Sequence, residues 1–227
     1  MPNALRTLGL ASALITALSA APAMAADSDT QWWNLVTATG HLQPKVRWYA
    51  EGQTRFSVVD RKSMDRTLLR GALGYQTAPK TSVWLGFGST PTYHPKFRDE
   101  TRWYQQFLYE DKVGGNALTD RFRFEQRDIQ DTSATSYRVR NMFRVAHPID
   151  KGGTWQAVAY DELFWNVNSV VGGPKAGFDQ NRVFLGANRK VAAHARIEAG
   201  YLRDDLKLAS GASRHLDCLV TQLSLTY

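Results

Sequence analysis

Two stretches within residues 120–147, joined by a polar loop, alternate charged and apolar side chains. From 121 to 127 the odd positions hold three arginines and one glutamate, with Phe122 and Phe124 between them. From 138 to 144 three arginines share one parity, and Val139 and Phe143 take the other. Side chains alternate between the two faces of a strand, so this period of two predicts two strands, each with a charged face.

A charged strand face restricts the fold class. A soluble sheet needs an apolar face for its core, whereas a membrane barrel turns its apolar face to lipid and its polar face to the lumen. We therefore predict an all-β, antiparallel transmembrane β-barrel. The mean hydropathy of −0.39 is compatible with this fold, because every second residue of such a barrel faces the lumen.

The pattern continues along the chain and is interrupted by connections that alternate between short turns and longer polar loops. Bacterial single-chain barrels normally have an even number of strands, and counting back from the last strand leaves one segment unpaired. We expect about 10 main strands (10–12) from Lys45 to Tyr227, with 31–39 as an extra short strand or luminal segment. The candidate strands are 31–39, 45–57, 65–77, 81–90, 100–112, 118–128, 136–147, 154–168, 178–189, 192–206 and 214–227.

The first 25 residues have the features of a signal peptide. A weakly basic start precedes the apolar run Leu8–Leu18, and Ala23-Met24-Ala25 matches an A-x-A cleavage site. The predicted organisation is a signal peptide at 1–25, an N-terminal leader with a short strand at 26–44, and an outer-membrane barrel at 45–227.

Export and the barrel pattern together predict the cell outer membrane of a Gram-negative bacterium. A terminal Tyr227 on an alternating strand resembles the signal read by the bacterial barrel-assembly machinery. The expected partners are this machinery, outer-membrane lipids and lipopolysaccharide. The net charge of +7 would favour nucleic acid in a cytoplasmic protein, but here it lies on alternating strand faces of an exported chain. We expect no nucleic-acid partner.

Alternation assigns many charged residues to the lumen. A narrow barrel filled with arginine and glutamate is either a structural plug of ion pairs or a narrow anion-favouring channel or binding site. Ten strands enclose too little space for a wide porin-like channel. The predicted luminal network comprises Glu51, Arg70, Arg102, Arg123, Glu125, Arg127, Arg138, Arg140, Glu162, Arg182, Arg196 and Glu198.

Glu162 is the acid of most interest, because an acid at membrane depth needs a partner, and Arg127, Arg140 or Arg182 could supply one. The same alternation turns its neighbour Asp161 to lipid. A bulge near Tyr160 would avoid this exposure.

An outer-membrane enzyme acting on lipid, lipopolysaccharide or peptide at the outer rim is the alternative function. His94 and His215 fall at the expected outer end, near Asp99, Asp128, Asp131 and Asp217. No Ser–His signature of a barrel hydrolase is present, so we assign no catalytic residue. The histidines lack metal-ligand spacing, and we expect neither a metal nor another cofactor. Cys218, the single cysteine, is interpreted as a packing residue.

Several runs resemble one family. The stretches GFDQNRVFLG (177–186) and IEAGYL (197–202), together with FRFEQR (122–127), YRVRNMFR (137–144) and DELFWNVN (161–168), are similar to an uncharacterised Gram-negative family catalogued as domain of unknown function 2490. The resemblance extends over essentially the whole mature chain. It implies an outer-membrane barrel and carries no activity with it.

Overall fold

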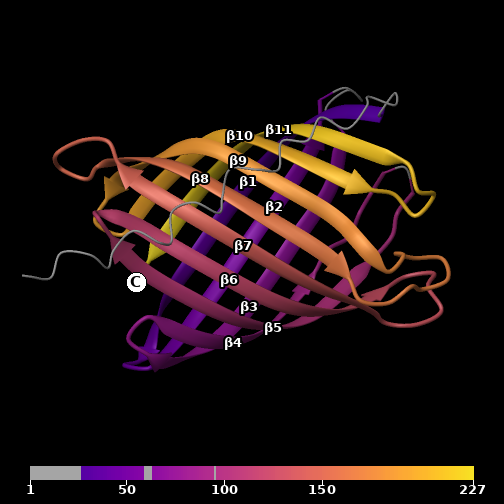
Figure 1. Cartoon of the computed structure of the whole chain (residues 1–227), viewed down its shortest axis with the longest axis horizontal. Helices are drawn as coiled ribbons and strands as arrows, with labels where there is room; N and C mark the ends of the chain where they lie inside the picture. The colour runs from indigo at the N-terminus through magenta and orange to yellow at the C-terminus, as the bar shows by residue number, and fades with distance from the viewer. Residues whose placement is uncertain (1–26, 59–62, 95) are drawn as a thin grey trace, which may run out of the picture.

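Eleven strands close into one barrel in the computed structural model, which describes residues 27–58, 63–94 and 96–227 (Figure 1). The signal peptide expected at 1–25 lies outside these ranges. No helix within them is long and apolar enough to cross a membrane. The strands are β1 (Asp27–Gln43), β2 (Val46–Ser57), β3 (Met64–Ala78), β4 (Thr81–Ser89), β5 (Glu100–Val113), β6 (Asn116–Ile129), β7 (Ser136–Pro148), β8 (Trp155–Asn166), β9 (Gly177–Ala192), β10 (Ala195–Lys207) and β11 (Ser213–Thr226).

The two ends of the barrel differ in their connections. At one end, four of the five connections are two residues long, and the fifth spans 149–154. At the other end, the five connections are five to ten residues long. We call these the short-turn end, on the left in Figure 1, and the long-loop end, on the right.

The barrel closes through a parallel pair. β1 lies beside β11 from Asp27–Arg214 to Thr39–Thr226, and both strands run from the long-loop end to the short-turn end. The other ten neighbouring pairs are antiparallel. An odd number of up-and-down strands can close only if the first and last strands run the same way, and this pairing provides that closure.

The prediction of an all-β barrel is confirmed, but the expected number of strands was wrong. The barrel has eleven strands rather than about 10. Residues 31–39 are neither an extra short strand nor a luminal segment, because they belong to the 17-residue β1 in the barrel wall. The barrel therefore begins before Lys45. The even-number rule failed because it presumes an antiparallel closure.

Strand stagger sets the shape of the barrel. Following Cα partners once around the wall from His41 on β1 leads back to β1 at Asp27, which is 14 residues nearer the long-loop end. With the usual spacings along and between strands, this stagger over eleven strands corresponds to a tilt of roughly 40°, typical of closed barrels. The oblique strands in Figure 1 show this tilt.

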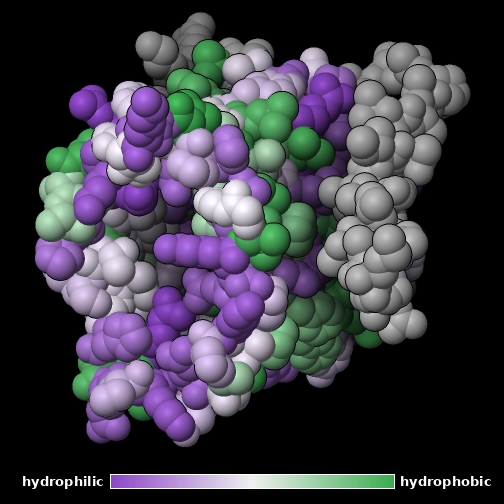
Figure 2. All heavy atoms as spheres, turned by 60° about the vertical axis from the view of Figure 1, so that its left-hand side comes forward, coloured by the Kyte–Doolittle hydropathy of each residue, from purple (hydrophilic) through white to green (hydrophobic). Residues whose placement is uncertain are grey.

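The outer surface of the barrel is largely apolar. Outward side chains on neighbouring strands include Leu69, Leu85, Phe107 and Phe122, each at least 45% exposed. Figure 2, which brings the short-turn end forward, shows hydrophilic residues gathered at that end and hydrophobic residues along the flank. The wall is therefore inverted relative to a soluble barrel.

The barrel interior has an apolar side and a charged side. Inward residues of β1 and β7–β11 form an apolar cluster that includes Trp33, Phe184, Leu202 and Cys218. Cys218 is 0% exposed and packs in this cluster. The inward faces of β2, β3, β5, β6 and β7 are rich in arginine and glutamate instead. Dispersion and the hydrophobic effect stabilise one side, and ion pairs fill the other.

Glycine makes room for the largest interior rings. A Cβ atom on Gly86 would lie 2.1 Å from Cζ of Tyr104, which occupies the space above the glycine from the facing position on β5. Gly74 gives the same room to Trp84, whose ring would lie 2.4 Å from an added Cβ. These glycines allow aromatic side chains to lie flat against the inner wall.

This packing gives a matched test. Gly86→Ala should lower the free energy of unfolding by about 1–3 kcal/mol through overpacking against Tyr104. Gly52→Ala is the control, because an added Cβ there would meet only Leu69 Cδ2 at 3.5 Å. Urea unfolding of the refolded proteins, followed by tryptophan fluorescence, measures both. Equal stability of the two variants would contradict the assigned position of Tyr104.

Candidate functional site

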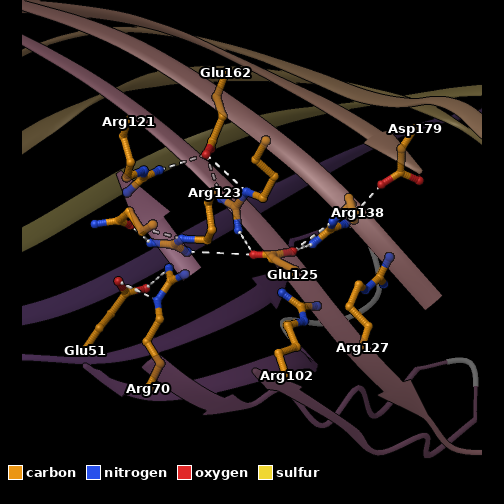
Figure 3. A network of polar contacts seen from close by, with 12 residues as sticks. Glu51, Arg70, Arg102, Arg121, Arg123, Glu125, Arg127, Arg138, Glu162 and Asp179 are labelled. Atoms are coloured by element: carbon orange, nitrogen blue, oxygen red, sulfur yellow. Dashed lines mark hydrogen bonds and ion pairs between the residues drawn. The ribbon is translucent and has the colours of Figure 1, made fainter. Parts of the chain in front are cut away.

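The candidate site is a charged network that fills the middle of the barrel, with Glu125 at its centre (Figure 3). Glu125 is 1% exposed. Arg138 donates to its Oε2 at 2.7 Å, and Arg140 donates to its Oε1 at 2.7 Å. Arg123 approaches the same carboxylate at 3.8 Å. One acid is therefore held by three guanidinium groups.

The strand register creates this arrangement. Glu125 on β6 lies opposite Arg138 on β7, and Arg123 lies opposite Arg140. Residues two apart on a strand share a face, so all four side chains point into the lumen. The alternation that defines the strands in the sequence thus also assembles the network.

Glu162 is a second centre. Its carboxylate accepts hydrogen bonds from Arg121 and from Arg140, each at 2.8 Å, and a guanidinium nitrogen of Arg182 lies 3.9 Å from it. Arg140 therefore links Glu162 to Glu125. Of the partners expected for Glu162, Arg140 and Arg182 are present, whereas Arg127 lies elsewhere and binds Glu100.

Two further acids extend the network. Glu51 accepts hydrogen bonds from Nε and Nη2 of its register partner Arg70, at 3.0 and 2.7 Å. It also accepts a hydrogen bond from the hydroxyl of Tyr49. Toward the long-loop end, Glu100 accepts from Arg102 at 2.5 Å and from Arg127 at 2.6 Å. Bidentate guanidinium–carboxylate pairs of this kind fix orientation as well as charge.

Aromatic rings support the buried guanidinium groups. Phe164 is 1% exposed and lies under Arg138, Arg140 and Arg182, whose Cζ atoms are 5.1, 4.4 and 4.7 Å from the ring centroid. Tyr104 lies 4.2 Å from Arg123 Cζ. These contacts replace part of the hydration that a guanidinium loses on burial.

All twelve residues of the predicted luminal network lie on the inner face of the barrel. Ten of them belong to the pairs around Glu51, Glu100, Glu125 and Glu162. The other two are nearer the short-turn end, where Glu198 binds Arg144 at 2.5 Å and Arg196 donates to Asn188 at 2.8 Å. Those two form a separate cluster.

Four inward acids, Glu100, Asp204, Asp179 and Asp29, were not predicted from the sequence. Asp29 has the parity of Trp33 on β1 and binds Arg214 at 3.3 Å. Glu100 has the parity of Arg102, and Asp204 has the parity of Glu198, so alternation could have identified both. Asp204 accepts from Arg182 at 3.1 Å. Asp179 binds Arg138 at 3.0 Å beside a register shift between β8 and β9, and such a shift left no signal in the pattern.

The bulge expected near Tyr160 is absent. The register of β8 with both neighbours is regular there, and the shift occurs at Phe164/Trp165. Asp161 therefore remains on the outer surface, where it accepts a hydrogen bond from Asn181 at 3.1 Å. A polar partner on the adjacent strand replaces the predicted bulge.

Two hollows lie on either side of the network. The larger, of about 1510 Å³, opens at the long-loop end and is lined by Arg66, Glu100, Arg127 and parts of the loops. The smaller, of about 200 Å³, lies toward the short-turn end beside Arg47, Glu110 and Arg123. Glu125, Arg138 and Arg140 line neither hollow, so the network lies between them.

The rim residues considered for catalysis do not form a constellation with histidine. Asp128 accepts a hydrogen bond from Thr135, and Asp217 accepts one from Tyr201. Asp99 accepts a hydrogen bond from the backbone amide of Glu100, and Asp131 lies near Lys96. Among the described residues, no group of three His, Cys, Asp or Glu side chains could hold a metal ion. His94 and Asp131 line the same larger hollow, and no hydrogen bond between them is found in the described part of the chain. The enzyme alternative stays a prediction.

Comparison with known proteins identifies a family. The family model described as "Protein of unknown function (DUF2490)" matches residues 30–214. An uncharacterized protein of Methylorubrum extorquens is 30% identical over 209 residues, which cover 89% of this chain and 90% of that protein. The family match includes most of β1, from residue 30, and the charged strands.

Two solved structures are similar over most of this chain. LpxR from Salmonella typhimurium gives a TM-score of 0.45 at 6% identity, with 79% of this chain and 83% of that chain covered. The siderophore receptor PirA from Pseudomonas aeruginosa gives 0.34 at 14% identity, with 78% and 35% covered. At these values neither likeness assigns a function.

The network makes a quantitative prediction. Glu125→Gln keeps the side-chain shape but leaves the surrounding guanidinium groups without their central charge, and should cost about 3–5 kcal/mol of stability. Asp131→Asn is the isosteric control, because Asp131 lies 3.6 Å from Lys96 with both side chains exposed, and should cost about 0–1 kcal/mol. Urea unfolding of both variants measures the difference. Equal losses would contradict a central role for Glu125.

Proposed function

The chain belongs to the family of proteins of unknown function DUF2490, and we propose a role for it from the structure of its barrel. We propose an outer-membrane barrel that is closed at mid-height by its arginine–glutamate network. At the long-loop end it opens as a cup that binds anionic groups. A channel for small anions through the same arginine-rich lumen is the alternative with less support.

The distribution of polarity supports the membrane location. Apolar side chains cover the outside of the strands, and charged side chains fill the inside, as expected when lipid is the outer solvent. Exposed aromatic residues lie near the short-turn end (Trp155, Tyr227) and near the long-loop end (Trp165, Phe178), as in interfacial girdles. The signal-peptide features of 1–25 agree with export.

The burial of Glu125 is the main observation in support of a closed lumen. A carboxylate that faces a water-filled channel would be hydrated, but this side chain is 1% exposed and surrounded by guanidinium groups. The residues between the two hollows are bonded to one another across β6, β7 and β8. An ion crossing the barrel would have to break these bonds.

The charge of the larger hollow supports anion binding. Among the described residues, three acids line it, namely Glu100, Asp131 and Asp179. Six cationic side chains of the same described ranges line it as well: Arg66, Lys96, Arg98, Arg127, Lys175 and Lys207. A concave surface with an excess of one charge concentrates ligands of the opposite charge. The hollow is thus a cup for anions.

Loops around the cup are tied together. Arg98 donates from Nε to the carbonyl of Gln130 at 2.8 Å and from Nη2 to the carbonyl of Gly172 at 2.6 Å. Gly172 has a φ of +75°, and a Cβ atom there would lie 2.5 Å from the carbonyl oxygen of Asp131. One arginine thus joins the β4–β5, β6–β7 and β8–β9 connections into a common wall.

Membrane insertion is tested at Phe124, which points outward between the inward Arg123 and Glu125. Phe124→Arg should cost roughly 2–4 kcal/mol if the position lies near the bilayer midplane, and should reduce the heat-modifiable folded form in outer-membrane fractions. Phe124→Leu is the control and should insert normally. Recovery of the wild-type protein as a soluble periplasmic monomer would contradict the location.

The closed lumen is tested in planar bilayers. The purified protein should give no conductance or only a small one, because the network fills the cross-section. Glu125→Ala should raise the frequency of open events by removing the residue that holds the arginines together. A large, steady conductance of the wild-type protein would contradict closure.

A further inference from the structure

Two arginines face each other across adjacent strands below the cup. Arg55 on β2 and Arg66 on β3 are direct register partners, and both point inward. The Cβ atoms of such partners lie about 4.5–5.5 Å apart, and like charges placed there are destabilising. Elsewhere in the network, two arginines that face each other share one carboxylate. Arg102 and Arg127, for example, are register partners and both bind Glu100. Because two facing positive charges repel each other, we expect an anion beside Arg55 and Arg66 as well.

No carboxylate binds either arginine among the described residues. Arg55 is 7% exposed, donates to Gln53 at 3.1 Å, and lies over the ring of Trp33 at 3.6 Å. Arg182 approaches the same Trp33 ring at 4.9 Å, so a second guanidinium group lies close to Arg55. A buried guanidinium surrounded mainly by like charge needs a counter-ion.

Arg66 is also short of a partner. Arg66 faces Arg55 in the register, and Glu100, which lines the same hollow as Arg66, is already held by Arg102 and Arg127. Its Nε is buried and makes no hydrogen bond within the described ranges, and the same is true of Nε of Arg55. Two unused donors thus belong to neighbouring positions on β2 and β3.

A third unused donor lies in the connection that follows β4. Arg66 pairs with Thr92 in an isolated bridge, so Thr90, two residues earlier, falls on the same inner face. Thr90 is 1% exposed, and its Oγ1 has no hydrogen-bond partner in the described part of the chain. Buried polar groups are nearly always satisfied, and three unsatisfied donors on three consecutive segments indicate a shared missing acceptor.

We propose that Arg55, Arg66 and Thr90 bind a phosphate group at the floor of the cup. Arg66 lines the hollow, and Arg55 is its register partner on β2. Thr90 lies two residues before Thr92, which also lines the hollow and pairs with Arg66. A tetrahedral dianion offers several acceptor oxygens to guanidinium and hydroxyl donors and neutralises two charges at once. The phosphate is either free or carried on a lipid headgroup. This inference rests on the proposed cup and names its ligand class.

The test uses the full mature protein in detergent. Its heat-modifiability temperature is measured with increasing inorganic phosphate against chloride at equal ionic strength, and in a second arm with a soluble short-chain phosphatidic acid. Phosphate should stabilise the wild type saturably. Arg66→Gln should weaken the apparent affinity on the order of tenfold or more. Lys175→Gln removes the same charge from the same hollow and should weaken it much less.

A further readout separates a ligand site from a structural arginine. Without phosphate, Arg66→Gln should unfold at the same or a higher temperature than the wild type, because it relieves the repulsion with Arg55. A lower unfolding temperature would overturn the proposal, as would equal effects of Arg66→Gln and Lys175→Gln. Stabilisation only by the phosphatidic acid assigns the site to a lipid headgroup, and stabilisation by both ligands assigns it to the phosphate itself.

Thr90→Val provides a second variant that leaves every charge in place. It should weaken phosphate binding with little change in the stability of the unliganded barrel. If Arg66→Gln does not refold, unchanged phosphate affinity in Thr90→Val overturns the proposal. Conductance is a separate measurement, so an open pore would refute the closed lumen without deciding the phosphate site.

Discussion

Guanidinium–carboxylate pairing inside a closed wall is the interaction on which this structure depends. Arginine cannot lose its charge on burial, so each inward arginine must find an acid, an aromatic face or a ligand. Glu125 and Glu162 meet this need for Arg121, Arg138 and Arg140. The ring of Phe164 lies against Arg138 and Arg140 of β7 and Arg182 of β9. The network is therefore both the filling of the lumen and the condition for its closure.

The same requirement explains how the barrel divides into zones. At mid-height the arginines share carboxylates, and the interior is closed and bonded across strands. Below the long loops, where no carboxylate of the described residues binds Arg55 or Arg66, the barrel opens into a hollow and these two arginines face each other. Across β1 and β7–β11, Trp33, Phe184 and their neighbours replace charge with apolar packing. Stability and ligand binding thus arise from one arginine-rich pattern, and the local supply of acids decides between them.

Alternation allowed the strands and most of the network to be predicted, because a period of two fixes the face of every residue once the strand is recognised. It places Glu125, Arg138 and Arg140 together from their spacing alone. Parity also held the information for Glu100 and Asp204, which were overlooked. Closure could not be read in this way, since the parallel pairing of β1 with β11 depends on two distant segments. The shift at Phe164/Trp165, which brings in Asp179, likewise has no local signature.

The most direct test of the central claim, a lumen closed by its ion pairs, is sided labelling of single cysteines. With Cys218 replaced by alanine, Ile129→Cys reports on the larger hollow and Thr119→Cys on the smaller one. In oriented vesicles, a membrane-impermeant charged thiol reagent should label residue 129 only from the long-loop side and residue 119 only from the short-turn side. Labelling of both positions from both sides would mean a continuous aqueous path and would contradict the account.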